Sequence, residues 1–394
     1  MVYIQVARVY SAECVLLPQS TSYTSFLWQH STLTMDSRDV PKIFVIGGTG
    51  AQGMPIVRSL VSDKRYQVRV LTRNTSSRRA QELSGLGNVE LFEGTLANET
   101  TLHNGLRGCY GAFVNIDGFN TGEKAEMFWA IRIYEIALEE GLKFFVYGNH
   151  DYALKAGAYN SKYRCGHLDG KGRIGEWILW QNTTNMDRMD AALFTGGPYI
   201  DMSISGATMM SPTIEDGIVT WRIPVGDVAV PFVALQDCGF YVRWMFDNPR
   251  LASGLDLRTA IAHITFHEMA AAFERVTGRP AQYIEMSMDD YWALYRDVAD
   301  LPAAYNADPN DASTMSTRDN FTGFWNFCKD GLMKREYAIL DEIHPNRIKT
   351  AEQWFRIEEA NGRASGKGSL WDRVQPENLT EVLKRGEDGG QGAL

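Results

Sequence analysis

Three features that would mark particular classes of protein are missing from this sequence. It has no run of about 18 apolar residues, so no membrane-spanning helix and no membrane partner are expected. Its 39 Lys and Arg are outnumbered by 48 Asp and Glu, which gives a net charge of −9. Because nucleic-acid binding needs clustered Lys and Arg, and only Arg78-Arg79 and scattered lysines near 162–173 occur, direct nucleic-acid binding is not expected.

Cysteine is scarce and dispersed. The 394 residues contain five cysteines, and no two form a Cys-x-x-Cys pair. This pattern indicates free thiols in a reducing compartment, and we expect a cytoplasmic protein, or a nuclear one if it is a regulator. His263, His267 and Glu268 lie close in sequence, but ITFHEMAAAF lacks the second His of a His-Glu-x-x-His motif, so no metal is expected.

Strand-like and helix-like segments alternate from residue 41 onward. Strands are predicted at 42–46, 66–71, 89–92, 112–116, 144–147 and 192–195, and helices at 52–62, 123–140 and 167–181. Such alternation produces crossover units and a mostly parallel sheet. The predicted fold class is α/β: a Rossmann-type, doubly wound parallel sheet with a smaller, irregular α+β C-terminal domain.

The segment IFVIGGTGAQG at 43–53 joins the first predicted strand to the first predicted helix. Gly47, Gly50 and Gly53 are spaced Gly-x-x-Gly-x-x-Gly, and Gly48 also makes the segment Gly-x-Gly-x-x-Gly. In a dinucleotide site, one such glycine permits the tight turn, one lets the pyrophosphate approach the backbone, and one lets helix and strand pack closely. The helix N-terminus then offers N–H groups to phosphate. A purely structural turn is the alternative.

The end of the second predicted strand selects between two dinucleotides. An NAD site commonly has Asp or Glu there, which binds the ribose 2′-OH. This chain has VRVLTRN instead, with Arg73 twenty residues beyond Gly53. A guanidinium matches a 2′-phosphate, so the sequence predicts NADP(H), and a solvated arginine at the strand end is the alternative.

Several segments together carry a resemblance to a known family. GGTGAQG, RVLTRN, HLDGKGRIGEWI at 167–178, IPVGDVAVPFVALQDCG at 223–239 and IHPNRIKTAEQWF at 343–355 resemble the NmrA-like family of atypical short-chain dehydrogenase relatives, and the C-terminal block looks like fungal members. The similarity runs from Met35 to about residue 360. It implies a Rossmann domain that binds NADP and a smaller, variable C-terminal domain that forms a cleft with it.

The resemblance also implies a set of cofactor contacts. They fall in the glycine-rich loop, at the ends of the predicted strands and at one helical lysine. Thr95 stands where many relatives carry an acidic residue. The implied residues are Gly47, Gly48, Thr49, Gly50, Ala51, Gln52, Gly53, Arg73, Asn74, Thr95, Leu96, Asn115, Ile116, Asp117, Lys171, Gly197, Pro198, Tyr199 and Met202.

The expected catalytic residues are Lys171 and His167. Short-chain dehydrogenases usually use Tyr-x-x-x-Lys, whose spacing puts both side chains on one helix face. Here His167 replaces the Tyr, and Gly148-Asn149 stands where the usual Ser is found. Either Lys171 is catalytic, as in the related isoflavone-reductase-like enzymes, with His167 as a proton relay, or Lys171 holds the cofactor ribose and His167 packs or caps.

Other residues are weaker candidates. His150 and Asp151, after the fifth predicted strand, line the nicotinamide end or belong to a polar loop. Tyr199 and Asp201, after the sixth, stand at the carboxyl edge of the sheet, where ligands bind in open α/β folds. Trp177 and Trp180 are expected to pack in a core. Core packing is also the default expectation for four further aromatic residues, with an apolar cleft wall as the alternative: Trp221, Phe232, Trp325 and Trp354.

The rhythm of the sequence changes after Gly196-Gly197-Pro198. Segments become irregular and rich in Met and aromatic residues, with helical patterns near 236–247, 266–277, 288–297 and 350–360. We predict a disordered or dispensable extension at 1–34, with a targeting segment as the alternative, and an NADP-binding Rossmann domain at 35–198. A C-terminal substrate or partner domain follows at 199–394, with some segments returning to the Rossmann sheet.

Two functions follow from these expectations. The first is an NADP(H)-dependent oxidoreductase of a small organic molecule, such as a secondary metabolite. The second is a non-catalytic redox sensor that binds NADP(H) and a transcription factor or other regulatory protein, and the missing Tyr and Ser motivate it. A homodimer is compatible with both.

Overall fold

The structure is a computed structural model that describes residues 40–383. These residues belong to one compact unit, which begins at Val40. The predicted extension at 1–34, the predicted domain start at residue 35 and the end of the chain from residue 384 lie outside the described residues.

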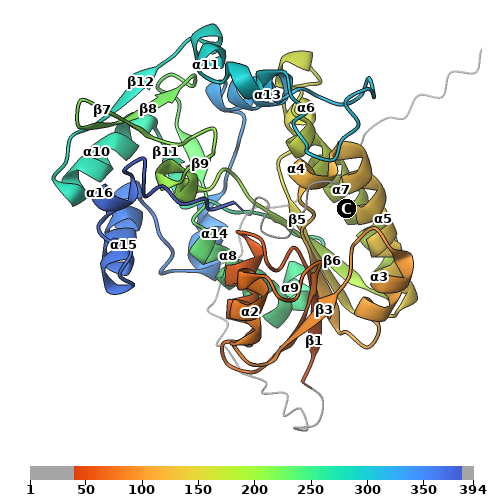
Figure 1. Ribbon diagram of the computed structural model, residues 1–394. Helices are drawn as coiled ribbons and strands as arrows, with labels where there is room; N and C mark the ends of the chain where they lie inside the picture. Colours follow the sequence, from red (N-terminus) through yellow and green to blue (C-terminus); the bar gives the residue numbers. More distant parts are fainter. Residues whose placement is uncertain (1–39, 384–394) are drawn as a thin grey trace, which may run out of the picture. The chain divides into compact units, whose positions relative to one another are not determined.

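A seven-stranded parallel sheet confirms the predicted fold class (Figure 1). The strands lie in the order β10-β6-β5-β4-β1-β2-β3. The chain runs outward from β1 in both directions, so β1 and β4 flank the point where the strand order reverses, which is where ligands bind in open α/β sheets. The strands are β1 (Lys42–Ile46), β2 (Gln67–Thr72), β3 (Val89–Glu93), β4 (Gly111–Val114), β5 (Phe144–Asn149), β6 (Asp190–Thr195) and β10 (Asp256–Arg258).

Helices cover both faces of this sheet. Because side chains alternate along a strand, Ile43 and Val45 pack with α1 (Gly53–Val61) and α8 (Leu235–Asp247) on one face. Phe44 and Ile46 pack on the other face with α3 (Glu99–Leu106), α5 (Glu123–Glu139) and α7 (Gly166–Asn185). Strand β10 pairs with β6 although it lies beyond residue 198 in sequence, so later segments complete the sheet.

Local signals explain several of the helix ends. Asn98 caps α3, and its side chain accepts a hydrogen bond from the backbone N–H of Thr101 at 2.9 Å. Gly141, with φ +75°, follows α5 in the left-handed conformation typical of a residue just past a helix. The predicted strand at 112–116 ends earlier, at Val114. The expected core position of Trp180 was wrong, because this side chain is 63% exposed.

The remaining segments form two small sheets and a group of helices. Strands β12 (Ala281–Glu285), β8 (Ile218–Ile223) and β7 (Thr213–Glu215) form one sheet, and β11 (Ala262–Ile264) pairs with β9 (Val230–Phe232) in the other. The predicted helix at 288–297 is divided into α11 (Met288–Leu294) and α12 (Arg296–Ala299). The longer helices of this region include α10 (Phe266–Thr277), α13 (Thr317–Lys329) and α15 (Ala351–Ala364). Two short helices of the sheet region are α2 (Arg78–Ser84) and α4 (Gly118–Thr121).

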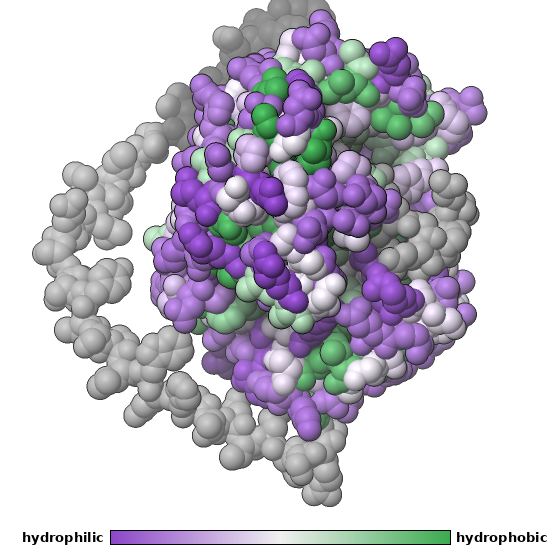
Figure 2. Space-filling model, turned by 60° about the vertical axis from the view of Figure 1, so that its left-hand side comes forward, coloured by the Kyte–Doolittle hydropathy of each residue, from purple (hydrophilic) through white to green (hydrophobic). Residues whose placement is uncertain are grey.

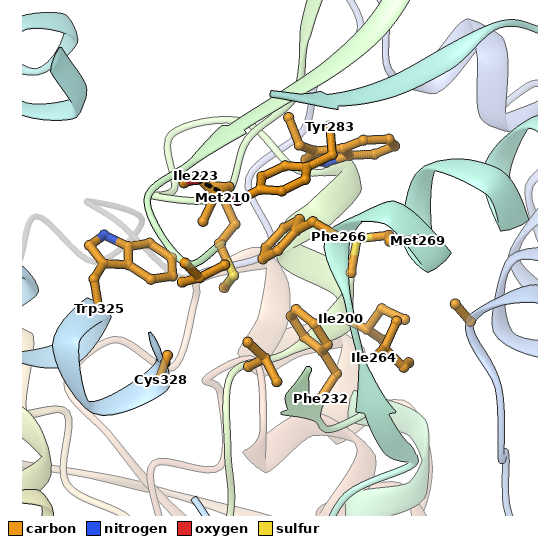
Figure 3. Close-up of a cluster of buried hydrophobic side chains, with 14 of the residues drawn as sticks. Ile200, Met210, Ile223, Phe232, Ile264, Phe266, Met269, Tyr283, Trp325 and Cys328 are labelled. Atoms are coloured by element: carbon orange, nitrogen blue, oxygen red, sulfur yellow. Dashed lines mark hydrogen bonds between the residues drawn. The ribbon is translucent and has the colours of Figure 1, made fainter. Parts of the chain in front are cut away.

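Aromatic and aliphatic side chains fill the space between these elements. Figure 3 shows Phe266 between Tyr283 and Phe232, with Trp325 approaching from α13. We call this cluster the C-terminal core. Trp221, Phe232, Trp325 and Trp354 are each at most 1% exposed, so they pack in this core and do not wall an open cleft.

One face of the molecular surface is mainly polar. The face drawn in Figure 2 is largely hydrophilic, and its apolar residues form small, separate groups. Within residues 40–383, no helix combines the length and apolar character needed to cross a membrane.

Candidate cofactor and active site

The glycine-rich loop between β1 and α1 can be built only with glycine at several positions. Gly47 has φ +80°, and a Cβ there would lie 2.3 Å from the carbonyl oxygen of Asn115. A Cβ on Gly53 would lie 2.1 Å from the Gly47 carbonyl oxygen. The backbone N–H of Gly50 donates to that same oxygen at 2.9 Å. These contacts force the sharp turn and the close strand–helix approach that the sequence predicted.

Gly48 and Gly50 have different surroundings. A Cβ on Gly48 would lie 2.7 Å from Val70, so this residue packs against β2. A Cβ on Gly50 would meet only the Gly47 carbonyl oxygen, at 3.1 Å, among the atoms of the described chain within 4 Å. One side of the loop at Gly50 is therefore open, which fits the approach of a phosphate group to the backbone at the start of α1.

Gln52 ties the loop to the segments that follow two other strands of the sheet. Its side-chain oxygen accepts a hydrogen bond from Asn115 at 2.9 Å, and its side-chain nitrogen donates to the Tyr199 hydroxyl at 3.4 Å. Asn115 follows β4 and Tyr199 follows β6, so the carboxyl ends of three strands meet here. The structure thus brings the predicted residues 47–53, Asn115 and Tyr199 to one edge of the sheet.

A second arginine lies beside the loop. Arg79, which is 8% exposed, donates hydrogen bonds to the carbonyl oxygens of Thr49 and Val382, each at 3.4 Å. Ser77 begins α2 by accepting a hydrogen bond from Ala80, and this helix start carries Arg79 to the loop. In the sequence Arg79 stands only as half of a short basic pair, although the Ser at the helix start is a usable signal for its position.

The other predicted cofactor residues have structural contacts of their own. Asn74 accepts a hydrogen bond from Ser76 in the turn after β2, and Thr95 accepts one from Ala97 after β3. Asp117 begins α4 by accepting the Phe119 N–H at 3.0 Å. Leu96 packs on the sheet face that carries Phe44 and Ile46, and Met202 packs against the C-terminal core. The contact of these residues, and of Arg73, Ala51 and Ile116, with a cofactor stays a prediction.

The turn after β6 is also tightly built. A Cβ on Gly197 would lie 2.7 Å from the carbonyl oxygen of Pro231. The Pro198 carbonyl oxygen accepts the Val233 N–H at 2.9 Å. This turn therefore anchors the end of β6 to the segment that follows β9, and a cofactor contact at Gly197 and Pro198 stays a prediction.

Lys171 is buried in a network at the same edge. Its ammonium group lies 2.6 Å from Glu126 Oε1 and donates to the Ile116 carbonyl oxygen at 2.8 Å. It also donates to Asn115 Oδ1 at 3.2 Å and to the Gly148 carbonyl oxygen at 3.3 Å. Lys171 is 5% exposed and Glu126 is fully buried. Lys171 therefore holds together the ends of β4 and β5.

Glu126 is a site residue that the sequence analysis missed. It accepts a hydrogen bond from the Tyr147 hydroxyl at 3.3 Å, and burial raises the pKa of its carboxyl group. A signal was present, because Glu126 shares the buried face of α5 with Ala130, Ile133 and Ala137 at helical spacing. An acidic residue on a buried helix face needs a basic partner.

His167 lies one helical turn before Lys171. Its ring packs against Phe119 and Phe321, with centroids 4.8 and 5.4 Å away. Its Nδ1 is 2.9 Å from Asn320 Nδ2 and 3.2 Å from Cys165 Sγ. Burial lowers the pKa of His167 to about 4, so the ring is neutral at pH 7. A neutral imidazole can donate at one nitrogen and accept at the other, but it supplies no fixed positive charge.

His150 and Asp151 follow β5 and behave differently. The His150 ring is 6.4 Å from the His167 ring, and burial lowers its pKa well below the usual value. Within residues 40–383, its buried Nδ1 has no hydrogen-bond partner. Asp151 instead forms a buried ion pair with Arg335, at 3.1 and 2.8 Å. Arg335 is almost two hundred residues away in sequence, so no local pattern could have indicated the pair.

Tyr199 and Asp201 differ in their relation to the edge. The Tyr199 hydroxyl contacts Gln52, as described above. Asp201 accepts the Leu235 N–H at 3.2 Å, and burial raises the pKa of its carboxyl group to about 7. Asp201 thus fixes the start of α8.

The chain is similar to a known protein family and to individual members of it. Residues 40–316 match the NmrA-like family. An NmrA-like family domain-containing oxidoreductase of Aspergillus hancockii is 27% identical over 262 residues, which cover 61% of this chain and 74% of that protein.

Solved structures share the fold at lower sequence identity. NmrA, described as a negative transcriptional regulator and solved in complex with NAD, has a TM-score of 0.64 and 15% identity, covering 84% of this chain and 99% of that one. The NADPH-dependent quinone oxidoreductase QOR2 of Escherichia coli, solved with NADPH, has a TM-score of 0.60 and 17% identity, covering 79% and 98%. A further NmrA structure holds NADP.

Proposed function

The chain belongs to the NmrA-like family, and from this membership we propose that it is an NADP(H)-dependent oxidoreductase acting on a small organic molecule. The observation that carries the proposal is the open, side-chain-free loop at Gly50, directly before the N-terminus of α1 at the switch point of the sheet. Relatives with the oxidoreductase name, and fold neighbours solved with nicotinamide dinucleotides, support it.

The residues at the sheet edge fit a dinucleotide. The N–H groups at the start of α1 would receive the pyrophosphate, because a helix N-terminus favours anions. Gln52, Asn115 and Lys171 would orient the ribose and nicotinamide end, since their side chains are already fixed to one another. The bound dinucleotide would supply or accept the hydride. The protein would position the two reactants and exclude water between them.

Arg73 would distinguish NADP(H) from NAD(H). It follows β2, where a guanidinium can bind a 2′-phosphate. We expect Arg73→Ala to weaken binding of NADP+ far more than binding of NAD+, as measured by isothermal titration calorimetry. Arg78→Ala is the matched control, because Arg78 is nearby and its side chain is 70% exposed. Equal losses for the two dinucleotides would remove Arg73 from 2′-phosphate recognition.

Lys171 and His167 would serve the reaction in different ways. Lys171 would hold the cofactor end of the site through its contacts at β4 and β5. His167, neutral and next to a pocket described below, would pass a proton to or from the substrate. Lys171→Ala should abolish NADPH oxidation, and circular dichroism should check that the variant is folded. Full activity in a folded variant would exclude Lys171 from the mechanism.

A second function is favoured by one observation. The Lys171 ammonium has four protein oxygens within 3.3 Å, and the Tyr and Ser of the usual catalytic set are missing. Such a site would bind a dinucleotide without turnover and act as a redox sensor for a protein partner. Partner capture that differs between NADP+ and NADPH, with no oxidation of NADPH across a carbonyl panel, would support this alternative. Capture indifferent to the dinucleotide would contradict it.

A further inference from the structure

A pocket of about 360 Å³ lies beside His167, which is one of its lining residues. Its walls come from α4, the starts of α5 and α7, the segment 303–315 and Asn320 of α13. Phe119, Ala304 and Met315 contribute apolar surface. The volume is within the range of pockets that hold small organic ligands.

Small residues keep this space open. Gly122, between α4 and α5, has φ +78°, and a Cβ there would lie 3.4 Å from Ala307 Cβ and 3.7 Å from Ala304 Cβ. The segment that carries both alanines is fixed to α4, because the Tyr305 N–H donates to the Phe119 carbonyl oxygen at 2.9 Å. The pocket is therefore a built feature of the fold, with a wall that belongs to a distant part of the sequence.

The charged side chains around the pocket are engaged with one another. Arg164 pairs with Asp169 at 2.9 Å and also with Glu123. Arg173 pairs with Glu123 at 2.5 Å, and Lys124 pairs with Asp311. The remaining lining carboxylate, Asp308, accepts the N–H of Asn310 within its own turn. These pairings leave no basic group dedicated to an anion, so the pocket suits a neutral ligand.

Two rings of an aromatic cluster, those of Phe119 and His167, line the pocket, and the rings of Phe321 and Phe324 pack against them. The rings of Phe119 and Phe321 are parallel, with an interplanar angle of 2° and centroids 5.9 Å apart. His167 packs against both rings and against Phe324, whose centroid is 5.8 Å away. Flat conjugated molecules gain energy from stacking on such rings. The Asn320 amide, which contacts His167, supplies a polar group to the pocket lining.

The pocket also adjoins the proposed cofactor edge. His167 is one turn from Lys171 on α7, and Lys171 donates to the carbonyl oxygen of Ile116 at the end of β4. Phe119 follows Ile116 by three residues. We propose that this pocket is the substrate site, and that it takes a neutral, flat, conjugated carbonyl or hydroxyl compound stacked on Phe119, with its oxygen directed to His167 and Asn320. This assignment rests on the proposed oxidoreductase function.

Three probes of similar size test the assignment. They are 2-acetonaphthone, which is neutral and flat, 2-naphthoate, which is flat and anionic, and 2-acetyldecalin, which is neutral and not flat. Binding of each to the full chain saturated with NADP+ should be measured by calorimetry. We expect 2-acetonaphthone to bind at least about tenfold more tightly than either other probe, a difference of about 1.4 kcal/mol. Equal binding of the three probes, or no binding of 2-acetonaphthone, would overturn the assignment.

Variants then locate the binding. Ala307→Phe should fill the pocket and weaken 2-acetonaphthone binding at least about tenfold, and Phe119→Leu should weaken it by removing the stacking ring. Ala293→Phe, at an exposed position of α11, is the matched control and should change nothing. Unchanged 2-acetonaphthone binding in both pocket variants would overturn the assignment.

The dinucleotide provides an independent readout. Binding of NADP+ should be the same in the pocket variants and the original chain, because neither substitution touches the glycine-rich loop. If the original chain binds no dinucleotide, the proposed function fails. If it binds NADP+ normally while the probes do not distinguish the pocket, only the substrate assignment fails.

Discussion

The carboxyl edge of the parallel sheet and the C-terminal core are both buried, but they are built from different groups. At the sheet edge, Lys171 pairs with the fully buried Glu126, and Asp151 pairs with Arg335. In the C-terminal core, side chains such as Phe232, Phe266 and Tyr283 meet through apolar contacts.

This difference has a physical consequence. A buried charge is costly unless a partner offsets the loss of water, so ion pairs at the edge depend on both members. Apolar packing instead depends on volume and tolerates exchange between similar shapes. The edge therefore combines the groups that can orient a polar cofactor with a strong sensitivity to single substitutions, whereas the core supplies stability that is spread over many contacts.

The largest expected effect comes from breaking one pair at the edge. Lys171→Met should lower the free energy of unfolding by about 3–5 kcal/mol, because Glu126 is left buried without its partner. The double variant Lys171→Met/Glu126→Leu should be considerably more stable than this single variant. Denaturant unfolding measures both. Glu126→Leu alone completes the cycle. If the stability loss of the double variant equals the sum of the losses in the two single variants, the two side chains are not coupled and the contrast between the sheet edge and the C-terminal core is wrong.

A cavity in the C-terminal core should have a similar or smaller effect without coupling to charge. Ile223→Ala, at a side chain that is 1% exposed, should cost about 2–5 kcal/mol. Ile223→Leu should cost less than about 1.5 kcal/mol, because the apolar volume is kept. Equal losses for the two substitutions in urea unfolding would show that volume does not control this core.

Protonation of His167 should make the free energy of unfolding depend on pH, whereas the apolar contacts of Ile223 in the C-terminal core should not. Its folded-state pKa is about 4, below the ordinary value of 6.5, so the unfolded chain binds more protons between these values. The contribution of neutral His167 to the free energy of unfolding is fully present above about pH 6.5. This contribution falls by at most about 3 kcal/mol as the pH is lowered toward 4.

The variant His167→Gln tests this pH dependence. It should flatten the pH dependence of the unfolding midpoint between pH 4 and 6.5, although His150, whose pKa is also lowered, will keep part of the slope. Ile223→Ala should leave the slope unchanged. An identical slope in His167→Gln and in the original chain would exclude His167 as a source of this dependence.

The smallest expected losses of stability come from removing helix caps, and they should be alike beside the parallel sheet and in the C-terminal region. Asn98 caps α3 next to the sheet, and Thr265 caps α10 in the C-terminal region, each by accepting an N–H from three residues further on. Asn98→Ala and Thr265→Ala should each cost about 1 kcal/mol, measured by thermal or urea unfolding. A much larger loss at one of them would mean that this cap also has a tertiary role.

Sequence reasoning succeeded where the signal was local. The run from Ile43 to Gly53 predicted a strand, a turn and a helix because its glycines meet atoms of their own loop, of β1 and β2, or of the residue that follows β4. Asn98 and Gly141 likewise mark helix ends through local conformation and contacts. Trp180 was misplaced because helical spacing does not say which face of α7 is covered.

The rest of the candidate site depends on distant segments. Glu126 and Arg335 reach the sheet edge from α5 and from the segment after α13, and the pocket wall comes from residues 303–315. The sequence by itself determined the parallel sheet, the glycine-rich loop and the family, because these follow from short-range spacing and backbone sterics. Only the tertiary structure decided which charges are paired and where a ligand-sized space remains, because pairing and packing depend on side chains that meet from far apart in the chain.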